Sequence, residues 1–389
     1  MRMKPFGLLV AGAMALSSHA ATADPVTIGM ITTLSGAGGY LGEETRDGFQ
    51  LAIDEGGGKL GGVPVKLLVE DDGLKPTNGR EIAERFIKRN NAKIFTGIVF
   101  ANVLLAAAPD ILESGAFYIG SVTGPSVYAG KGCEKNYFIS SFQTDSVAES
   151  AGQLANNLGY KKMIAIAVNY QAGKDALDGF KRFYKGQIAG EIFTRLDQTD
   201  FAAEIAQIRA AAPDAVFAFL PGGFGITFLK QYAQAGLKDK IPLVVSHASM
   251  EQRLMAAVGD AALGVYNSSY WSPDIDNPAS KAFVKAFQAK HNRVPTFYAA
   301  TAYDAARLIG SALHAVNGDV SKADAFRDAL KKADFASVRG SFKFGNNHHP
   351  IQDWLALRVE RNASSALENR IIGKVFTAHT DVFASQCKM

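Results

Sequence analysis

The chain has 389 residues, of which 48% are hydrophobic and 20% are charged, as in an ordinary globular protein. This length favours two domains. The formal net charge is only +4, and basic residues alternate with acidic ones. Because no basic patch emerges from this distribution, we do not expect a nucleic-acid partner.

Residues 1–23 have the pattern of a signal peptide. Arg2 and Lys4 precede an apolar run over residues 6–16, and small residues follow. A membrane anchor is the alternative, but the run is shorter than the roughly 20 apolar residues that span a bilayer. We expect cleavage before Asp24, which leaves 39 basic residues against 37 acidic ones. No lipobox cysteine is present, so we expect a soluble periplasmic protein.

Cys133 and Cys387 are the only cysteines of the chain. Export places them in an oxidising compartment, and an even number favours one disulfide. Such a bond ties the tail to the body of the protein. Two buried free thiols are the alternative.

The mature chain begins with a strand, a glycine-rich turn and a helix. Residues 26–31 are mostly apolar or β-branched and predict a strand that leads to the turn at residues 34–39. Apolar residues at helical spacing follow as far as Ile53. This order is typical of a parallel α/β sheet, in which ligands bind at the carboxyl ends of strands. The turn, with its glycines and Ser35, is therefore a candidate ligand contact.

The alternation continues along the chain. The next strands are nearly continuous in apolar residues, which is typical of a parallel sheet covered on both faces, with right-handed crossovers. We predict strands at 64–70, 93–99 and 117–122, and helices at 76–90 and 101–114.

A second series of elements starts near residue 145. It predicts a second α/β domain, with the chain passing between the two domains more than once. The expected helices are 146–158, 175–184, 226–235, 278–291, 299–316 and 322–333; the expected strands are 162–168, 191–193, 215–220, 243–245 and 264–270, with a late strand pair at 340–344 and 354–361.

Several motifs at strand ends resemble a known family in their order and spacing. They are Leu34-Ser35-Gly36, Glu70-Asp71-Asp72, Pro125 after the turn 121–124, and Thr199-Asp200-Phe201. The chain resembles the periplasmic substrate-binding proteins of the Leu/Ile/Val-binding type, which serve ABC importers, from Asp24 to about Phe376. Segments 345–348, 350–353 and 386–389 look like those of members that bind aromatic acids.

The resemblance implies an α/β fold of two Rossmann-like lobes with parallel-rich sheets, joined by three hinge crossings (periplasmic binding protein type I). Lobe one is expected at 24–141 plus 272–340, and lobe two at 142–271 plus 341–389. The crossings are expected near Phe142, Tyr270 and Phe344. A ligand in the cleft stabilises the closed form only if it contacts both lobes.

The resemblance also implies ligand contacts at strand ends. Thr123 matches a hydroxyl that holds a ligand carboxylate, and Tyr40 replaces an aromatic that relatives carry at the position of Leu41. Each of these residues also has a purely structural interpretation, as a turn, core or rim residue. The implied contacts are Ser35, Gly36, Gly39, Tyr40, Leu41, Phe100, Ala101, Asn102, Ser121 and Thr123 in lobe one, and Tyr170, Pro221, Gly222 and His247 in lobe two.

One departure from the family bears on the ligand. Amino-acid binders carry an acid near the turn that here reads Ser246-His247-Ala248-Ser249, and no acid stands in that turn. An unpaired buried ammonium would cost several kcal/mol. We therefore predict a small carboxylate without an α-amino group, such as a benzoate or cinnamate derivative. A branched-chain or other amino acid remains the alternative, as does a role as ligand-sensing partner of a membrane receptor.

Catalytic motifs are absent from the sequence. It has no G-x-S-x-G elbow, P-loop or H-E-x-x-H motif, so we do not expect an enzyme or a cofactor. His348-His349 lacks further ligands at metal-binding spacing, and we expect no metal there. The expected partners are the carboxylate ligand and an ABC importer permease, with the protein itself a monomer.

Overall fold

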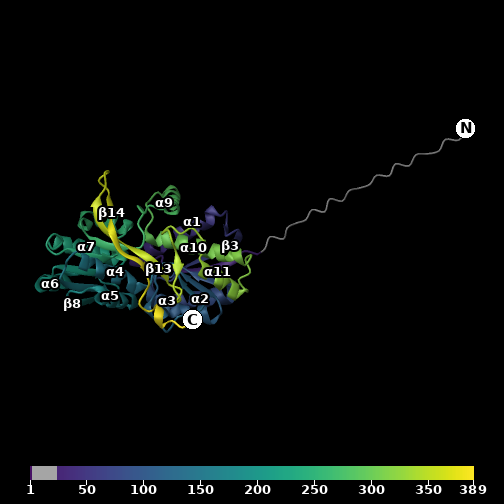
Figure 1. Cartoon of the computed structure of the whole chain (residues 1–389), viewed down its shortest axis with the longest axis horizontal. Coiled ribbons are helices and arrows are strands. Elements are labelled where there is room, and N and C mark those ends of the chain that lie inside the picture. Colours follow the sequence, from purple (N-terminus) through teal and green to yellow (C-terminus); the bar gives the residue numbers. More distant parts are fainter. Residues whose placement is uncertain (2–23) are drawn as a thin grey trace.

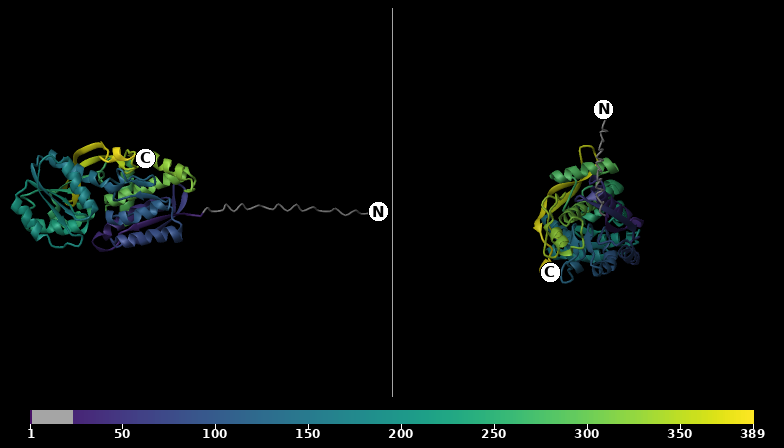
Figure 2. Two further views of the ribbon diagram at one scale, coloured as in Figure 1. Left: turned by 90° about the horizontal axis from the view of Figure 1, so that it is seen from below. Right: turned by 90° about the vertical axis from the view of Figure 1, so that its right-hand side faces the viewer.

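Two lobes, each built on an open sheet with helices against it, make up the computed structural model (Figures 1 and 2). The structure describes Met1 and residues 24–389, so the predicted signal peptide lies outside the described residues. The predicted class, an α/β fold of two lobes with parallel-rich sheets, is confirmed. Among the described residues, no helix is long and apolar enough to cross a membrane.

The first sheet has the strand order β2-β3-β1-β4-β5-β6. All its neighbouring strands are parallel except β2 and β3, which form a hairpin. Its strands are β1 (Val26–Thr32), β2 (Lys59–Leu60), β3 (Val63–Asp71), β4 (Ile94–Thr96), β5 (Phe117–Gly120) and β6 (Tyr137–Ile139). The helices of this lobe are α1 (Gly39–Glu55), α2 (Pro76–Asn90), α3 (Ala101–Glu113), α9 (Pro278–His291), α10 (Phe297–Ala315) and α11 (Ala323–Lys332), with short 3-10 turns η1 (Gly36–Gly38) and η2 (Ser126–Tyr128).

The second sheet has the order β12-β13-β11-β10-β9-β7-β8, and β14 pairs with β13. Its strands are β7 (Lys162–Val168), β8 (Gln187–Thr194), β9 (Ala215–Phe219), β10 (Leu243–Ser246), β11 (Tyr266–Ser269), β12 (Lys343–Phe344), β13 (Pro350–Arg361) and β14 (Leu367–His379). Its helices are α4 (Thr144–Asn157), α5 (Gln171–Phe183), α6 (Ala202–Ala211), α7 (Gly223–Gln234) and α8 (Gln252–Val258), with turns η3 (His247–Ser249), η4 (Gly259–Ala262) and η5 (Ala384–Gln386).

The late strand pair differs from its prediction. The predicted pairing of 340–344 with 354–361 shrinks to two residue pairs, Lys343 with Ile351 and Phe344 with Pro350. The main partner of β13 is β14, an antiparallel strand that the pattern did not predict. Most side chains of β14 are partly or fully exposed, so no apolar run marks it in the sequence.

Arg339 joins the segments by which the chain passes between the two sheets. Its buried guanidinium pairs with Asp304 at 3.1 Å and donates hydrogen bonds to the backbone oxygens of Ser140 and Ser141. It also donates to the side-chain oxygen of Gln352 on β13 at 2.8 Å. A single cation thereby satisfies buried acceptors from several crossing segments.

The predicted disulfide between Cys133 and Cys387 is present. The two cysteines are 254 residues apart in the sequence. The C-terminal segment, yellow in Figures 1 and 2, therefore runs from the second sheet back to the loop after η2 in lobe one. Asn346 and Asn347 hold this tail by hydrogen bonds to Ala384 and Asp381.

Candidate ligand-binding site

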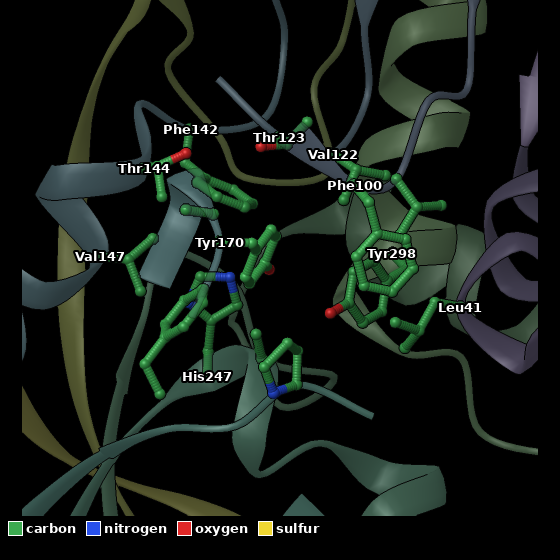
Figure 3. A pocket seen from close by; sticks show the side chains of 15 residues that line it. Leu41, Phe100, Val122, Thr123, Phe142, Thr144, Val147, Tyr170, His247 and Tyr298 are labelled. Atoms are coloured by element: carbon green, nitrogen blue, oxygen red, sulfur yellow. The ribbon is translucent and has the colours of Figure 1, made fainter. Parts of the chain in front are cut away.

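A cavity with about 390 Å³ of unfilled space lies between the lobes (Figure 3). The lining is mostly apolar with a few polar side chains, which is the usual character of a small-molecule site. It is lined by Leu41, Val99, Phe100, Val122, Thr123, Phe142, Thr144, Val147, Tyr170, Ala172, Phe219, Pro221, His247, Ala248 and Tyr298.

Strand ends and helix starts position this lining. Phe100 and Tyr170 occupy the N-cap positions of α3 and α5, and Thr144 is the first residue of α4. The first amides of a helix have no intrahelical acceptor, and the helix dipole gives that end a partial positive charge. Helices from both lobes therefore begin at the cavity and favour a negative group there.

Three polar side chains of the lining are buried without a hydrogen-bond partner. They are Thr123, Thr144 and His247, which are 4%, 1% and 1% exposed. In Figure 3 the hydroxyl oxygens of Thr123 and Thr144 are turned toward each other, with His247 at the other end of the cavity. A buried polar group without a partner costs about 1–3 kcal/mol, so these groups are available for a ligand.

His247 is held by aromatic rings rather than by hydrogen bonds. Its ring meets those of Phe297, Phe142 and Tyr270 edge-on, with centroids 4.1, 5.0 and 5.3 Å away. Burial lowers the pKa of His247 to about 3, so the imidazole is neutral at physiological pH. It can accept and donate a hydrogen bond but offers no charge.

Charged side chains do not line this cavity in the part of the chain that the structure describes. Glu251, two residues beyond the turn that lacks an acid, lines a neighbouring cavity instead. Its carboxylate accepts hydrogen bonds from the amides of Arg253 and Leu254 at the start of α8, and from the hydroxyl of Tyr40 at 2.8 Å. Burial raises the pKa of Glu251 to about 7.

The cleft rim carries polar contacts between the lobes. Tyr40 of lobe one bonds Glu251 of lobe two, and Arg253 pairs with Glu43 at 3.0 Å. On another part of the rim, the Ser126 hydroxyl donates to Asp175 at 2.8 Å. The first two contacts join α1 to the start of α8, and the third joins η2 to α5.

The structure brings six of the predicted contact residues to the cavity lining: Leu41, Phe100, Thr123, Tyr170, Pro221 and His247. Eight others do not line it: Ser35, Gly36, Gly39, Tyr40, Ala101, Asn102, Ser121 and Gly222.

Local structure accounts for several of the eight. Gly36 has a φ of 69°, and a Cβ on Gly39 would lie 2.8 Å from the backbone oxygen of Leu34, so both glycines serve the turn. Gly222 has a φ of 65° and packs on Ala37 of the other lobe. Ser121 and Asn102 have buried side-chain oxygens without a hydrogen-bond partner, but neither residue belongs to the lining.

Sequence reasoning missed Phe142, Thr144 and Tyr298. The polar residues after β6 are a signal for Thr144, because they follow the end of a strand, as the other expected contacts do. Tyr298 had no such signal, since α10 follows a loop rather than a strand. In Figure 3 its hydroxyl is directed into the space beside Tyr170 and His247.

His348 and His349 lie apart from this cavity. His348 stacks on Phe138 of β6 with ring centroids 4.0 Å apart, and burial lowers its pKa to about 4. Within the described residues, no three His, Cys, Asp or Glu side chains gather as a metal site.

Comparison with known proteins identifies the family and the fold. The family model described as "Periplasmic binding protein" matches residues 25–365. The Leu/Ile/Val-binding protein homolog 6 of Brucella abortus (strain 2308) is 28% identical over 92% of this chain and 93% of its own length. A solute-binding protein of an ABC transporter from R. palustris, solved in complex with benzoate, has a TM-score of 0.89 and 29% identity over 94% of this chain and all of its own. A second, from Rhodopseudomonas palustris BisB5 in complex with 3,4-dihydroxybenzoic acid, has a TM-score of 0.84 and 28% identity over 92% of this chain and 99% of its own.

The fold and the family match define a solute-binding protein rather than an enzyme. The chain belongs to the periplasmic binding protein family, and its predicted resemblance to the Leu/Ile/Val-binding type is confirmed.

Proposed function

We propose that this protein is the periplasmic solute-binding component of an ABC importer and captures a small aromatic carboxylate, such as a benzoate or cinnamate derivative. One observation carries the proposal. The cavity between the lobes is mostly apolar, has no acidic or basic side chain in its described lining apart from neutral His247, and contains buried hydroxyls without partners.

The carboxylate is placed between Thr123 of lobe one and Thr144 of lobe two. Both hydroxyls can donate to it, and Thr144 stands at the N-terminus of α4, where the helix dipole favours a negative group. Hydrogen bonds to a charged group contribute about 1.5–3 kcal/mol each. Because these donors belong to different lobes, the ligand favours the closed form.

Aromatic side chains suit a flat ligand body. Phe100 of lobe one and Tyr170 of lobe two face each other with ring centroids 6.1 Å apart, and Tyr298 lies beside them. Offset or edge contacts with such rings contribute about 0.5–1.5 kcal/mol beyond burial. An α-ammonium would find no carboxylate in this lining, which disfavours an amino acid.

The two solved relatives bind benzoate and 3,4-dihydroxybenzoic acid, which supports an aromatic acid. The names of the curated relatives favour the second candidate, a branched-chain amino acid. The signal-peptide pattern and the disulfide support export to an oxidising compartment. A permease is the expected partner, and we expect a monomer. The closed form could instead be recognised by a membrane receptor.

Titration calorimetry with benzoate, cinnamate and leucine tests the ligand class. We expect at least one aromatic acid to bind and leucine to give no response. Tight leucine binding without any response to the acids would refute the proposal. X-ray scattering with and without the ligand then tests lobe closure.

A further inference from the structure

A second cavity adjoins the ligand site at His247. It is small, with room for about one water-sized group such as a hydroxyl. His247 lines both cavities, and neither of its ring nitrogens has a hydrogen-bond partner. The other lining residues are Met250, Glu251, Gln252, Asn267, Ser269, Trp271, Ser272, Phe297, Leu357 and Asn369.

A chain of hydrogen bonds fixes what Asn267 offers to this second cavity. The amide nitrogen of Asn369 donates to the backbone oxygen of Met250 at 2.9 Å, so its oxygen is the acceptor. That oxygen accepts a hydrogen bond from the side-chain amide nitrogen of Asn267 at 2.8 Å. The side-chain oxygen of Asn267 is thus left over, on a residue that is fully buried, and it has no donor.

The two serine hydroxyls of the second cavity already have acceptors. The Ser269 hydroxyl donates to the backbone oxygen of Trp271 at 2.8 Å. The hydroxyl of Ser272 contacts the backbone oxygen of Asn369 at 3.5 Å. Among the groups without a partner, the Asn267 oxygen can only accept a hydrogen bond, whereas neutral His247 can accept at one ring nitrogen and donate at the other.

We infer that the ligand site continues past His247 into this second cavity, which takes a hydrogen-bond-donating substituent, such as a phenolic hydroxyl, at the end of the acid opposite its carboxylate. This inference rests on the proposed function. Thr123 and Thr144 lie at the other end of the cavity in Figure 3, so a carboxylate held there directs the far end of the ring toward His247. A hydroxyl on that end supplies the donor that the Asn267 oxygen lacks.

Calorimetry on the intact mature protein with matched pairs tests this: benzoate against 4-hydroxybenzoate, and cinnamate against 4-hydroxycinnamate. The two pairs reach to different depths. In at least one pair we expect the hydroxylated acid to bind about fivefold more tightly, as one net hydrogen bond predicts. The corresponding methyl ether has no donor and should show no gain.

Asn267→Ala should abolish the advantage of the hydroxyl and change the affinity for the parent acid by less than about twofold. Asn347→Ala is the matched control. Asn347 is also buried and donates to Asp381, but it lines neither cavity, so the hydroxyl advantage should persist. If Asn267→Ala does not fold, the comparison of hydroxyl with methyl ether in the unmodified protein decides alone.

The outcomes separate the inference from the proposed function. Binding of the parent acids with no gain from the hydroxyl in either pair overturns the inference alone. An equal gain from the methyl ether overturns it too. Failure of every aromatic acid to bind overturns the proposed function, and the inference with it.

Discussion

The rim of the cleft and the cavity behind it both join lobe one to lobe two, but their polar groups differ. On the rim, Tyr40 is bonded to Glu251 and Ser126 to Asp175. In the cavity, Thr123, Thr144 and His247 have no partner. The rim is complete without a ligand, whereas the cavity is not.

This difference divides the free energy of closure into two parts. Changing the ratio of closed to open protein from 1:99 to 99:1 takes roughly 5.5 kcal/mol of preference for the closed form. Rim contacts supply some of that preference with any ligand or none. The cavity hydroxyls supply it only when an acceptor arrives, so selectivity belongs to the cavity. The following substitutions test the division, from the largest expected effect to the smallest.

Glu251→Gln tests the rim through its pH dependence. Burial raises the pKa of Glu251 from 4.5 to about 7 in the folded protein, so the folded state holds this proton more tightly than the unfolded state. The contribution of Glu251 to stability is therefore full below about pH 4.5 and is lost as the pH rises through 7. Urea unfolding should show that, between about pH 5 and about pH 8, the free energy of unfolding falls by on the order of 3 kcal/mol more in the unmodified protein than in the variant. Equal losses in both proteins would contradict this.

Thr123→Val tests the cavity. It replaces an unpaired buried hydroxyl with a methyl group of similar size, so the free energy of unfolding should hardly change. Benzoate affinity should fall about 10- to 100-fold, because a hydrogen bond to a charged group is lost. Thr96→Val is the control, since the Thr96 hydroxyl donates to the backbone of Ile119 at 2.7 Å, away from the cavity. It should lower stability and leave affinity unchanged; the reverse pattern would remove Thr123 from the site.

Tyr40→Phe removes one hydrogen bond between the lobes. Affinity for benzoate should fall about fivefold, the equivalent of ~1 kcal/mol, without a change in selectivity among acids. Tyr303→Phe removes a similar bond to Glu55, but both residues belong to lobe one. Calorimetry should find its affinity unaltered. If both variants bind alike, the Tyr40 bond does not assist closure.

Arg253→Gln removes the partly exposed ion pair with Glu43. Such pairs contribute less than about 1 kcal/mol and are screened by salt. The small loss of affinity should be measurable at about 0.05 M salt and should disappear at about 0.5 M. A loss that is independent of salt would indicate packing of Arg253 on the Tyr40 ring instead.

Local patterns predicted most strands and helices, and the family resemblance implied the six lining residues. They failed where the answer depends on tertiary contacts. Tyr40 and Leu41 are neighbours on α1, and successive helix residues point about 100° apart, so only one can face the cavity. The bond from Tyr40 to a residue 211 positions away decides which one does. Tyr298 reaches the cavity only because the chain returns to lobe one after β11.

The Cys133–Cys387 bond makes the C-terminal tail a covalent link between the two lobes. The tail begins at the end of β14 on the lobe-two sheet, and the disulfide attaches it to Cys133 in lobe one. Residues 380–386 connect β14 to Cys387, and a segment of this length spans on the order of 25 Å when fully extended. If the lobes separate as the proposed function requires, this disulfide limits how far they can move apart, and its reduction should remove that limit without changing any residue that lines the cavity.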